Sequence, residues 1–191
     1  MTRDTHKRHI AIWRALAVLA ASALCASMAS ANESITPDDV KGPFQWGAAS
    51  RVTQLRHLYF ADQPDRAGLE SARDAGVAIV INMRAPSEID WGEQAAVEEL
   101  GMSYVNVPVT GRSFDPDQFE KIESTIAAHP NEKILVHCGS SNRVGGWLTT
   151  HLVTRHDMSE ADALAVGRRA GITNPGIEKR VHAYLEAREL K

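Results

Sequence analysis

An apolar run that ends in a histidine and a cysteine constrains this chain more than any other feature. Ile134–Val136 is apolar throughout, His137 and Cys138 follow it, and four small residues then lead to Arg143. A short run of this kind is typical of a strand buried on both faces of a sheet. The chain turns apolar and helix-compatible again over residues 147–153. The pattern predicts a strand, a tight loop and a helix.

The loop between Cys138 and Arg143 has the properties of an anion cradle. Its small side chains let main-chain N–H groups turn inward, and the start of the following helix adds positive potential at the same point. A thiolate is stabilised in such a field. Arg143 offers a planar, two-pronged donor for an oxyanion. We therefore predict that Cys138 is a nucleophile and that Arg143 clamps the oxyanion.

These residues resemble the signature of the cysteine-dependent tyrosine and dual-specificity phosphatases. The resemblance rests on His137-Cys138, a short Ser/Asn/Gly loop and Arg143 at a strand-to-helix turn. Those enzymes place five residues between Cys and Arg, whereas this chain has four. The bacterial phosphatase-like domain of beta-lactamase-hydrolase-like proteins also uses four and typically reads Cys-x-Ser-Gly-Asn-Arg. Cys138, Ser140, Asn142 and Arg143 match that pattern.

Two residues of the loop depart from the phosphatase pattern. Ser141 stands in the place of Gly, and it is a strained substitute if this position needs a positive φ. Val144 stands where the phosphatases usually carry a Ser or Thr that helps the thiolate leave, which implies slow turnover. The resemblance further implies that His137 tunes the thiolate from behind the loop. It assigns the phosphate-binding loop to Gly139, Ser140, Ser141, Asn142 and Val144.

The rest of the chain alternates apolar runs with helical segments. Val77–Ile81 and Tyr104–Val109 are two further candidate buried strands, and we expect them to lie beside Ile134–Val136. Strand and helix in alternation predict a three-layer α/β domain with a central, mainly parallel sheet. The resemblance implies that this domain is dual-specificity-phosphatase-like. The active crevice of such a sheet lies at the carboxyl ends of its strands.

Weaker signals lie outside the loop. The resemblance also covers Gln63-Pro64, Ile81–Arg84 and Pro108-Val109. Arg84 and Glu88 follow a buried strand, and we expect either a structural ion pair between them or a role for Arg84 near the substrate.

The general acid is not evident from the sequence. In the dual-specificity phosphatases an Asp follows the strand equivalent to Tyr104–Val109, and Gly111 takes that position here. Asp115 and Asp117 come shortly afterwards and are possible general acids. Asp115 also precedes Pro116, which is the pattern of a helix N-cap.

The first 31 residues read as a secretory signal peptide. A basic head precedes an apolar run over residues 15–24, and Ala29-Ser30-Ala31 is a small-residue cleavage site. The run is shorter than the roughly 20 residues that span a bilayer. We expect cleavage after Ala31, export to the periplasm or the medium, and no stable membrane insertion afterwards. Residues 32–50 lack a sustained period and predict an irregular lead-in to a phosphatase-like domain over residues 51–191.

Composition restricts the partners of the mature chain. Loss of four basic residues and one acidic residue with the leader leaves 17 basic and 23 acidic residues, a net charge near -6. We therefore expect no nucleic-acid partner. Cys138 becomes the only cysteine, which excludes a disulfide within the chain and favours a chemical role. We expect neither a metal nor another cofactor, because the remaining histidines are not spaced along the chain like metal ligands. These histidines are His57, His129, His151, His156 and His182.

Three functions are consistent with this sequence. The first is a periplasmic cysteine-dependent phosphatase that hydrolyses phosphate monoesters of the phosphotyrosine type through a phosphocysteine, with a phosphorylated protein or a small phosphate ester as its partner. The second is a rhodanese-like sulfurtransferase that carries a persulfide on Cys138 and takes sulfur from a donor, because the sulfurtransferases share the four-residue loop. The third is a non-catalytic anion-binding domain, as Ser141 and Val144 would permit.

Overall fold

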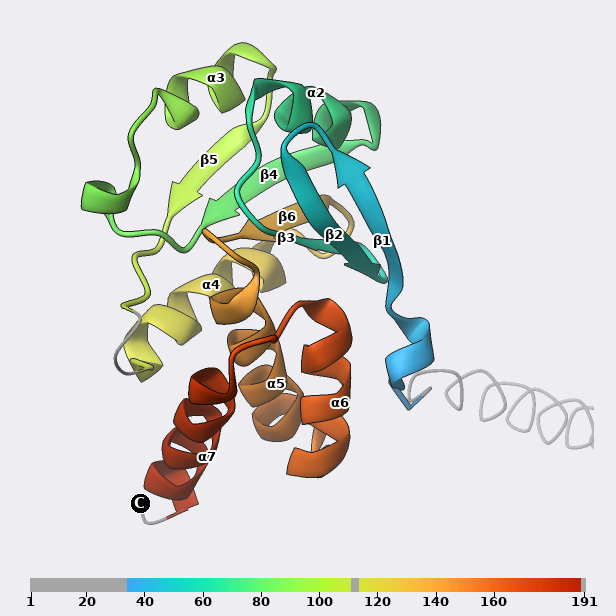
Figure 1. Ribbon diagram of the computed structural model, residues 1–191, viewed down its shortest axis with the longest axis vertical. Helices are drawn as coiled ribbons and strands as arrows, with labels where there is room; N and C mark the ends of the chain where they lie inside the picture. Colours follow the sequence, from blue (N-terminus) through green and yellow to red (C-terminus); the bar gives the residue numbers. More distant parts are fainter. Residues whose placement is uncertain (1–33, 111–113, 190–191) are drawn as a thin grey trace, which may run out of the picture. The chain divides into compact units, whose positions relative to one another are not determined.

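A computed structural model describes residues 34–110 and 114–189 (Figure 1). The chain divides into two units, Met1–Ile35 and Thr36–Lys191, and every described helix and strand belongs to the second. The predicted signal peptide over residues 1–31 lies outside the described residues. Within the described ranges, no helix is long and apolar enough to cross a membrane.

Six strands form one sheet in the order β1-β2-β3-β6-β4-β5. The strands β1, β2 and β3 pair antiparallel, whereas β3, β6, β4 and β5 run parallel to their neighbours. The predicted mainly parallel sheet is confirmed, and so is the adjacency of the three predicted strands, since β6, β4 and β5 are neighbours. The predicted burial of Tyr104–Val109 is wrong for the strand itself, because β5 lies at the edge of the sheet, ends at Asn106 and has no buried residue. From β1 to β6 the strands span Lys41–Trp46, Ala49–Leu55, Leu58–Ala61, Val77–Asn82, Ser103–Asn106 and Lys133–His137.

Helices cover both faces of the sheet, which gives the predicted three-layer α/β architecture. Figure 1 shows α2 and α3 on one face and α4 to α7 on the other. Tyr59, Val80 and Leu135 point from three neighbouring strands into the core beneath α2 and α3. The helices span Arg66–Asp74 (α2), Glu93–Glu99 (α3), Pro116–Ala128 (α4), Asn142–His156 (α5), Glu160–Ala170 (α6) and Pro175–Glu189 (α7), and two short 3-10 helices span Pro37–Asp39 (η1) and Pro86–Glu88 (η2).

Side-chain caps fix three of the helix starts. Asp65 accepts a hydrogen bond from the Gly68 N–H at the start of α2, and Asp115 and Ser159 cap α4 and α6 in the same way. Each cap satisfies a main-chain donor that the helix leaves unpaired, a contribution of about 1 kcal/mol. The cap at Asp115 stands where the sequence predicts it.

The predicted irregular lead-in over residues 32–50 is wrong for Lys41–Trp46, which forms β1, and for the start of β2. The side chains of β1 are exposed from Lys41 to Gln45, so the strand buries no apolar face that a sequence pattern would reveal. Pro43 suits this position, because an edge strand needs only one row of main-chain hydrogen bonds. The sheet therefore begins at Lys41, before residue 51.

Two adjacent glycines let the helix after the cysteine loop pack closely against α6 and the chain that follows it. A Cβ atom on Gly145 would lie 2.8 Å from the Gly167 carbonyl oxygen and 2.7 Å from Ile172 Cγ1. A Cβ atom on Gly146 would lie 2.6 Å from the ring of Phe114. These glycines thus set the position of α5, the helix that carries Arg143.

We predict that Gly145→Ala destabilises the protein by about 2 kcal/mol, because overpacking outweighs the gain in helix propensity. For a chain of this size the loss lowers the melting temperature by roughly 4–8 °C, measurable by circular dichroism. Gly92→Ala is the matched control, since no atom lies within 4 Å of its Cβ position. Equal melting temperatures for the two variants would contradict close packing at Gly145.

Candidate active site

The sheet fixes the main chain on both sides of the predicted nucleophile. His137 ends β6, and its carbonyl oxygen accepts a hydrogen bond of 2.9 Å from the Met83 N–H. The Cys138 N–H donates to the Ala61 carbonyl oxygen at 3.3 Å. Cys138 is a free, fully buried thiol. Two neighbouring strands therefore hold this cysteine at the carboxyl edge of the sheet, where the sequence predicts it.

Ser141 adopts the left-handed conformation that the glycine of the family pattern would favour. Its φ is 62° and its ψ is -12°, a region that costs a residue with a Cβ atom about 1–3 kcal/mol. Its hydroxyl is buried and has no hydrogen-bond partner within the described residues. A Cβ atom on Gly171 would lie only 2.4 Å from Ser141 Cβ. The serine fits here because residue 171 is a glycine.

Asn142 connects the loop to the turn between α6 and α7. Its Oδ1 accepts hydrogen bonds from the N–H groups of Thr173 and Asn174 at 2.8 and 2.9 Å, and its Nδ2 donates to the Ser140 carbonyl oxygen at 3.2 Å. The amide is thus engaged by the protein. Asn142 lies in the predicted phosphate loop, but its side chain braces the loop and leaves only its main chain for an anion.

The start of α5 leaves main-chain donors for an anion in the loop. The Gly145 N–H donates to the Ser141 carbonyl oxygen at 2.9 Å as a regular helical bond. The N–H groups of the three residues before Gly145 precede the helical hydrogen-bonding pattern. Val144 is fully buried, so it contributes its N–H and not its side chain. Gly139 and Ser140 are exposed at the mouth of the loop.

Arg143 is fixed along one edge of its guanidinium group. Nη1 donates to the Val109 carbonyl oxygen at 3.0 Å and to Glu88 Oε2 at 2.7 Å, and Nη2 donates to Glu88 Oε1 at 3.1 Å. Burial opposes its charge, yet the hydrogen bonds to Glu88 and the electrostatic attraction of Cys138 hold the pKa of Arg143 above its ordinary value. The guanidinium group is therefore oriented by Glu88 and interacts electrostatically with Cys138.

Glu88 remains charged at neutral pH. The hydrogen bond from Arg143 holds the pKa of Glu88 below its ordinary value of 4.5. A lowered pKa means that the pair contributes fully above pH 4.5 and is lost as the pH falls through the lowered value. The predicted ion pair between Arg84 and Glu88 is wrong, because Arg84 donates to the Glu88 carbonyl oxygen and to Gln63 Oε1. Sequence reasoning gave Glu88 the wrong partner because it paired neighbours along the chain.

A buried polar cluster lies on the α3 side of the sheet, next to the cysteine. Its centre is Glu93, whose Oε1 lies 2.5 Å from His137 Nε2 with both side chains fully buried. Glu93 Oε2 accepts hydrogen bonds from Asn82 Nδ2 at 3.0 Å and from Gln63 Nε2 at 3.1 Å. Glu93 is not recognisable from the sequence pattern, since an acidic residue in the first turn of a helix is ordinarily exposed.

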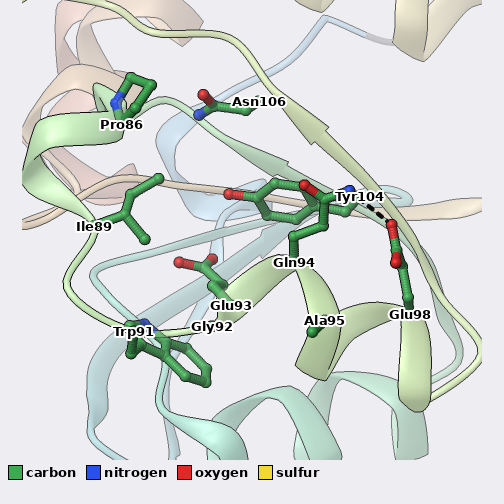
Figure 2. Close-up of a pocket in the computed structure, with 10 residues that line it drawn as sticks. All are labelled: Pro86, Ile89, Trp91, Gly92, Glu93, Gln94, Ala95, Glu98, Tyr104 and Asn106. Carbon is green, nitrogen blue, oxygen red and sulfur yellow. Dashed lines mark hydrogen bonds between the residues drawn. The ribbon is translucent and has the colours of Figure 1, made fainter.

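An open hollow of about 570 Å³ lies beside this cluster (Figure 2). Trp91, Ile89 and Tyr104 form apolar walls, and Glu93 lies at its base in the first turn of α3. In Figure 2 the Glu93 carboxylate and the Tyr104 hydroxyl point toward the same end of the hollow. Asn82 Nδ2 donates to both groups at 3.0 Å.

The two candidate general acids lie at the start of α4. Asp115 and Asp117 are exposed, and the Asp115 carboxylate accepts a hydrogen bond from the Asp117 N–H at 3.0 Å. Capping therefore accounts for Asp115, while a catalytic role for either residue stays a prediction. Gly111 lies outside the described residues. No group of three metal-ligating side chains occurs within the described ranges.

The model of the family described as "Beta-lactamase hydrolase-like protein, phosphatase-like domain" matches residues 51–155, more than half of the chain. The chain belongs to this phosphatase-like family. The predicted resemblance is confirmed, and membership makes the protein a hydrolase of the phosphatase type. A search of curated proteins found no match.

Solved structures show the same fold as this phosphatase-like domain. A DUF442 protein of Shewanella putrefaciens CN-32 has 20% identity and a TM-score of 0.55, and the match covers 70% of this chain and 91% of that one. Tk-PTP in its active form has 22% identity, a TM-score of 0.57 and coverage of 69% and 92%. TpbA of P. aeruginosa has 15% identity, a TM-score of 0.59 and coverage of 71% and 83%.

We predict that Ser141→Gly stabilises the phosphatase-like domain by about 1 kcal/mol, since glycine adopts a positive φ without strain and removes a buried, unpaired hydroxyl. The melting temperature should rise by roughly 2–4 °C. Ser140→Gly serves as the control, because Ser140 has no positive φ and its hydroxyl accepts a hydrogen bond from Asn142. A Ser141→Gly variant that melts below the wild type would show that strain does not dominate at this position.

Proposed function

We propose that the protein is a cysteine-dependent phosphatase that hydrolyses phosphate monoesters of the phosphotyrosine type. The arrangement of Arg143 supports this proposal most strongly. Glu88 and the Val109 carbonyl oxygen hold one edge of its guanidinium group, and the attraction between Arg143 and Cys138 helps to raise the pKa of Arg143. An arginine oriented in this way offers a planar fork for two oxygens of a tetrahedral oxyanion directly beside the nucleophile.

The proposed reaction has two displacements at phosphorus. The Cys138 thiolate attacks the phosphoryl group, a sulfur–phosphorus bond forms, and the ester oxygen leaves with the electron pair of the broken bond and takes up a proton. Arg143 and the main-chain N–H groups at the start of α5 stabilise the three remaining oxygens. Water then attacks the phosphocysteine, which releases inorganic phosphate and restores the thiol.

The engagement of Asp115 within the described residues favours aryl esters as substrates. The Asp115 carboxylate is engaged as a helix cap. A phenolate leaves readily without a proton, whereas an alkoxide of high basicity needs a general acid. A variant of the structural neighbour TpbA was solved in complex with phosphotyrosine, an aryl phosphate. We therefore propose a phosphotyrosine-bearing protein or a small aryl phosphate as the substrate.

We predict that Cys138→Ser abolishes hydrolysis of an aryl phosphate without unfolding the protein, because Ser matches Cys in size but is far less acidic. Arg143→Lys should reduce kcat/KM by at least about a hundredfold, since Lys keeps the charge but loses the fork. Arg155→Lys is the matched control, because Arg155 lies on the same helix α5 and pairs with Glu123. Full activity in the Cys138→Ser variant would exclude the mechanism.

The same preparation distinguishes the rival functions. Orthovanadate should inhibit a phosphatase competitively, since the loop then binds tetrahedral oxyanions. A sulfurtransferase would instead gain one sulfur on Cys138 after treatment with thiosulfate and would transfer it to cyanide. A protein that binds phosphate but turns over neither substrate would be the non-catalytic anion-binding domain.

We also propose that the mature phosphatase acts in the periplasm. The basic head, the apolar run and the Ala29-Ser30-Ala31 site support this location. Mass spectrometry of protein from a periplasmic extract should identify Asn32 as the first residue. A protein that retains the apolar run and sediments with membranes would contradict the proposal.

A further inference from the structure

Glu93 is buried against His137, the residue before the proposed nucleophile. It has no role in the two proposed displacements at phosphorus. Only 1% of its surface is exposed. Acidic side chains are rarely buried to this extent unless they are paired, since loss of hydration costs several kcal/mol per charge. The partners that Glu93 holds therefore indicate why the chain tolerates it.

The partners of Glu93 suit an ionised carboxylate. Oε2 accepts hydrogen bonds from two side-chain amides, those of Asn82 and Gln63. N–H donors stabilise the charged form of a carboxylate. Oε1 faces His137 Nε2 at 2.5 Å. Two polar atoms this close need a proton between them, and Nε2 can supply it.

The sheet register places this pair directly beside the cysteine loop. Ala61, His137 and Asn82 are register partners on β3, β6 and β4, so His137 and Asn82 lie side by side at the carboxyl edge. His137 and Leu135, two residues apart on β6, point to the same face, where α3 presents Glu93. The next residue after His137 is Cys138. The Glu93 carboxylate therefore contacts the imidazole from the α3 side, and strands β3 and β4 flank His137 within the sheet.

We propose that Glu93 is a positioning residue that acts through His137. It holds the imidazole as a cation behind the loop, and this positive charge stabilises both the Cys138 thiolate and the bound phosphoryl dianion. The inference rests on the proposed phosphatase function and adds a residue outside the cysteine loop to its machinery.

Two other residues, Tyr104 and Arg84, face the same cluster and could also influence how activity depends on pH. Tyr104 approaches from β5, and burial together with the Glu93 charge raises its pKa above its ordinary value, so it stays neutral in the working range. Arg84 reaches the cluster through Gln63 and through Asn82. Neither group replaces Glu93, because no hydrogen bond joins Tyr104 or Arg84 to His137 within the described residues.

The proposal is tested by the reactivity of Cys138 toward iodoacetamide and by kcat/KM for an aryl phosphate, each measured over a range of pH. Glu93→Gln keeps the shape of the side chain and removes its charge. We expect alkylation at about pH 6.5 to slow by about tenfold, and the profiles of both reactions to move to higher pH. Glu98→Gln, on the same helix but exposed, should match the wild type.

A conservative variant separates charge from packing. Glu93→Asp keeps the carboxylate but leaves a larger void than Gln does, so positioning by charge predicts that Asp recovers part of the lost reactivity. A purely structural role predicts the reverse order, with Asp more damaging than Gln. Circular dichroism establishes that each variant is folded.

A double mutant tests whether the effect passes through the histidine. His137→Asn alone should slow alkylation about as much as Glu93→Gln, and the two substitutions together should be no worse than either alone. Independent, multiplying losses would overturn the proposal, as would wild-type reactivity in either single variant. Failure of this inference leaves the phosphatase function intact, because the Cys138→Ser variant and the orthovanadate and thiosulfate measurements test that function separately.

Discussion

The parallel pairing of β6 with β3 on one side and β4 on the other is the constraint on which the site depends. It binds the main chain of His137 through the Met83 N–H and that of Cys138 through the Ala61 carbonyl oxygen. A nucleophile on a free loop would have to be ordered again for each reaction, at an entropic cost of about 1–2 kcal/mol for each residue. Here the conformational entropy of these residues is lost once, when the sheet folds.

Two carboxylates support the site from different directions. Glu88 follows β4 and orients Arg143 by two hydrogen bonds, whereas Glu93 begins α3 and faces His137 across the buried cluster. In each case an acidic side chain lies against a basic one that belongs to the cysteine loop or directly precedes it.

The sequence predicted the features that depend on local pattern. Apolar runs such as Ile134–Val136 indicate buried strands, and Asp115 before Pro116 indicates a helix start. The exposed edge strand Lys41–Trp46 was not predictable, because hydrogen bonds to β2 form it and apolar burial does not. Glu93 was not predictable either, since its partners on β4, on β6 and in the segment after β3 come together with α3 only in the folded domain. The conformation of Ser141 was anticipated from the family pattern, but its tolerance depends on Gly171, thirty residues away in the sequence.

The most direct measurement is mass spectrometry of the protein quenched with acid during turnover of an aryl phosphate. If Cys138 is the nucleophile, the peptide that contains it carries the added mass of one phosphoryl group, and this mass disappears as substrate is exhausted. Turnover without a phosphorylated Cys138, or with the phosphoryl group on another residue, would contradict the proposed chemistry.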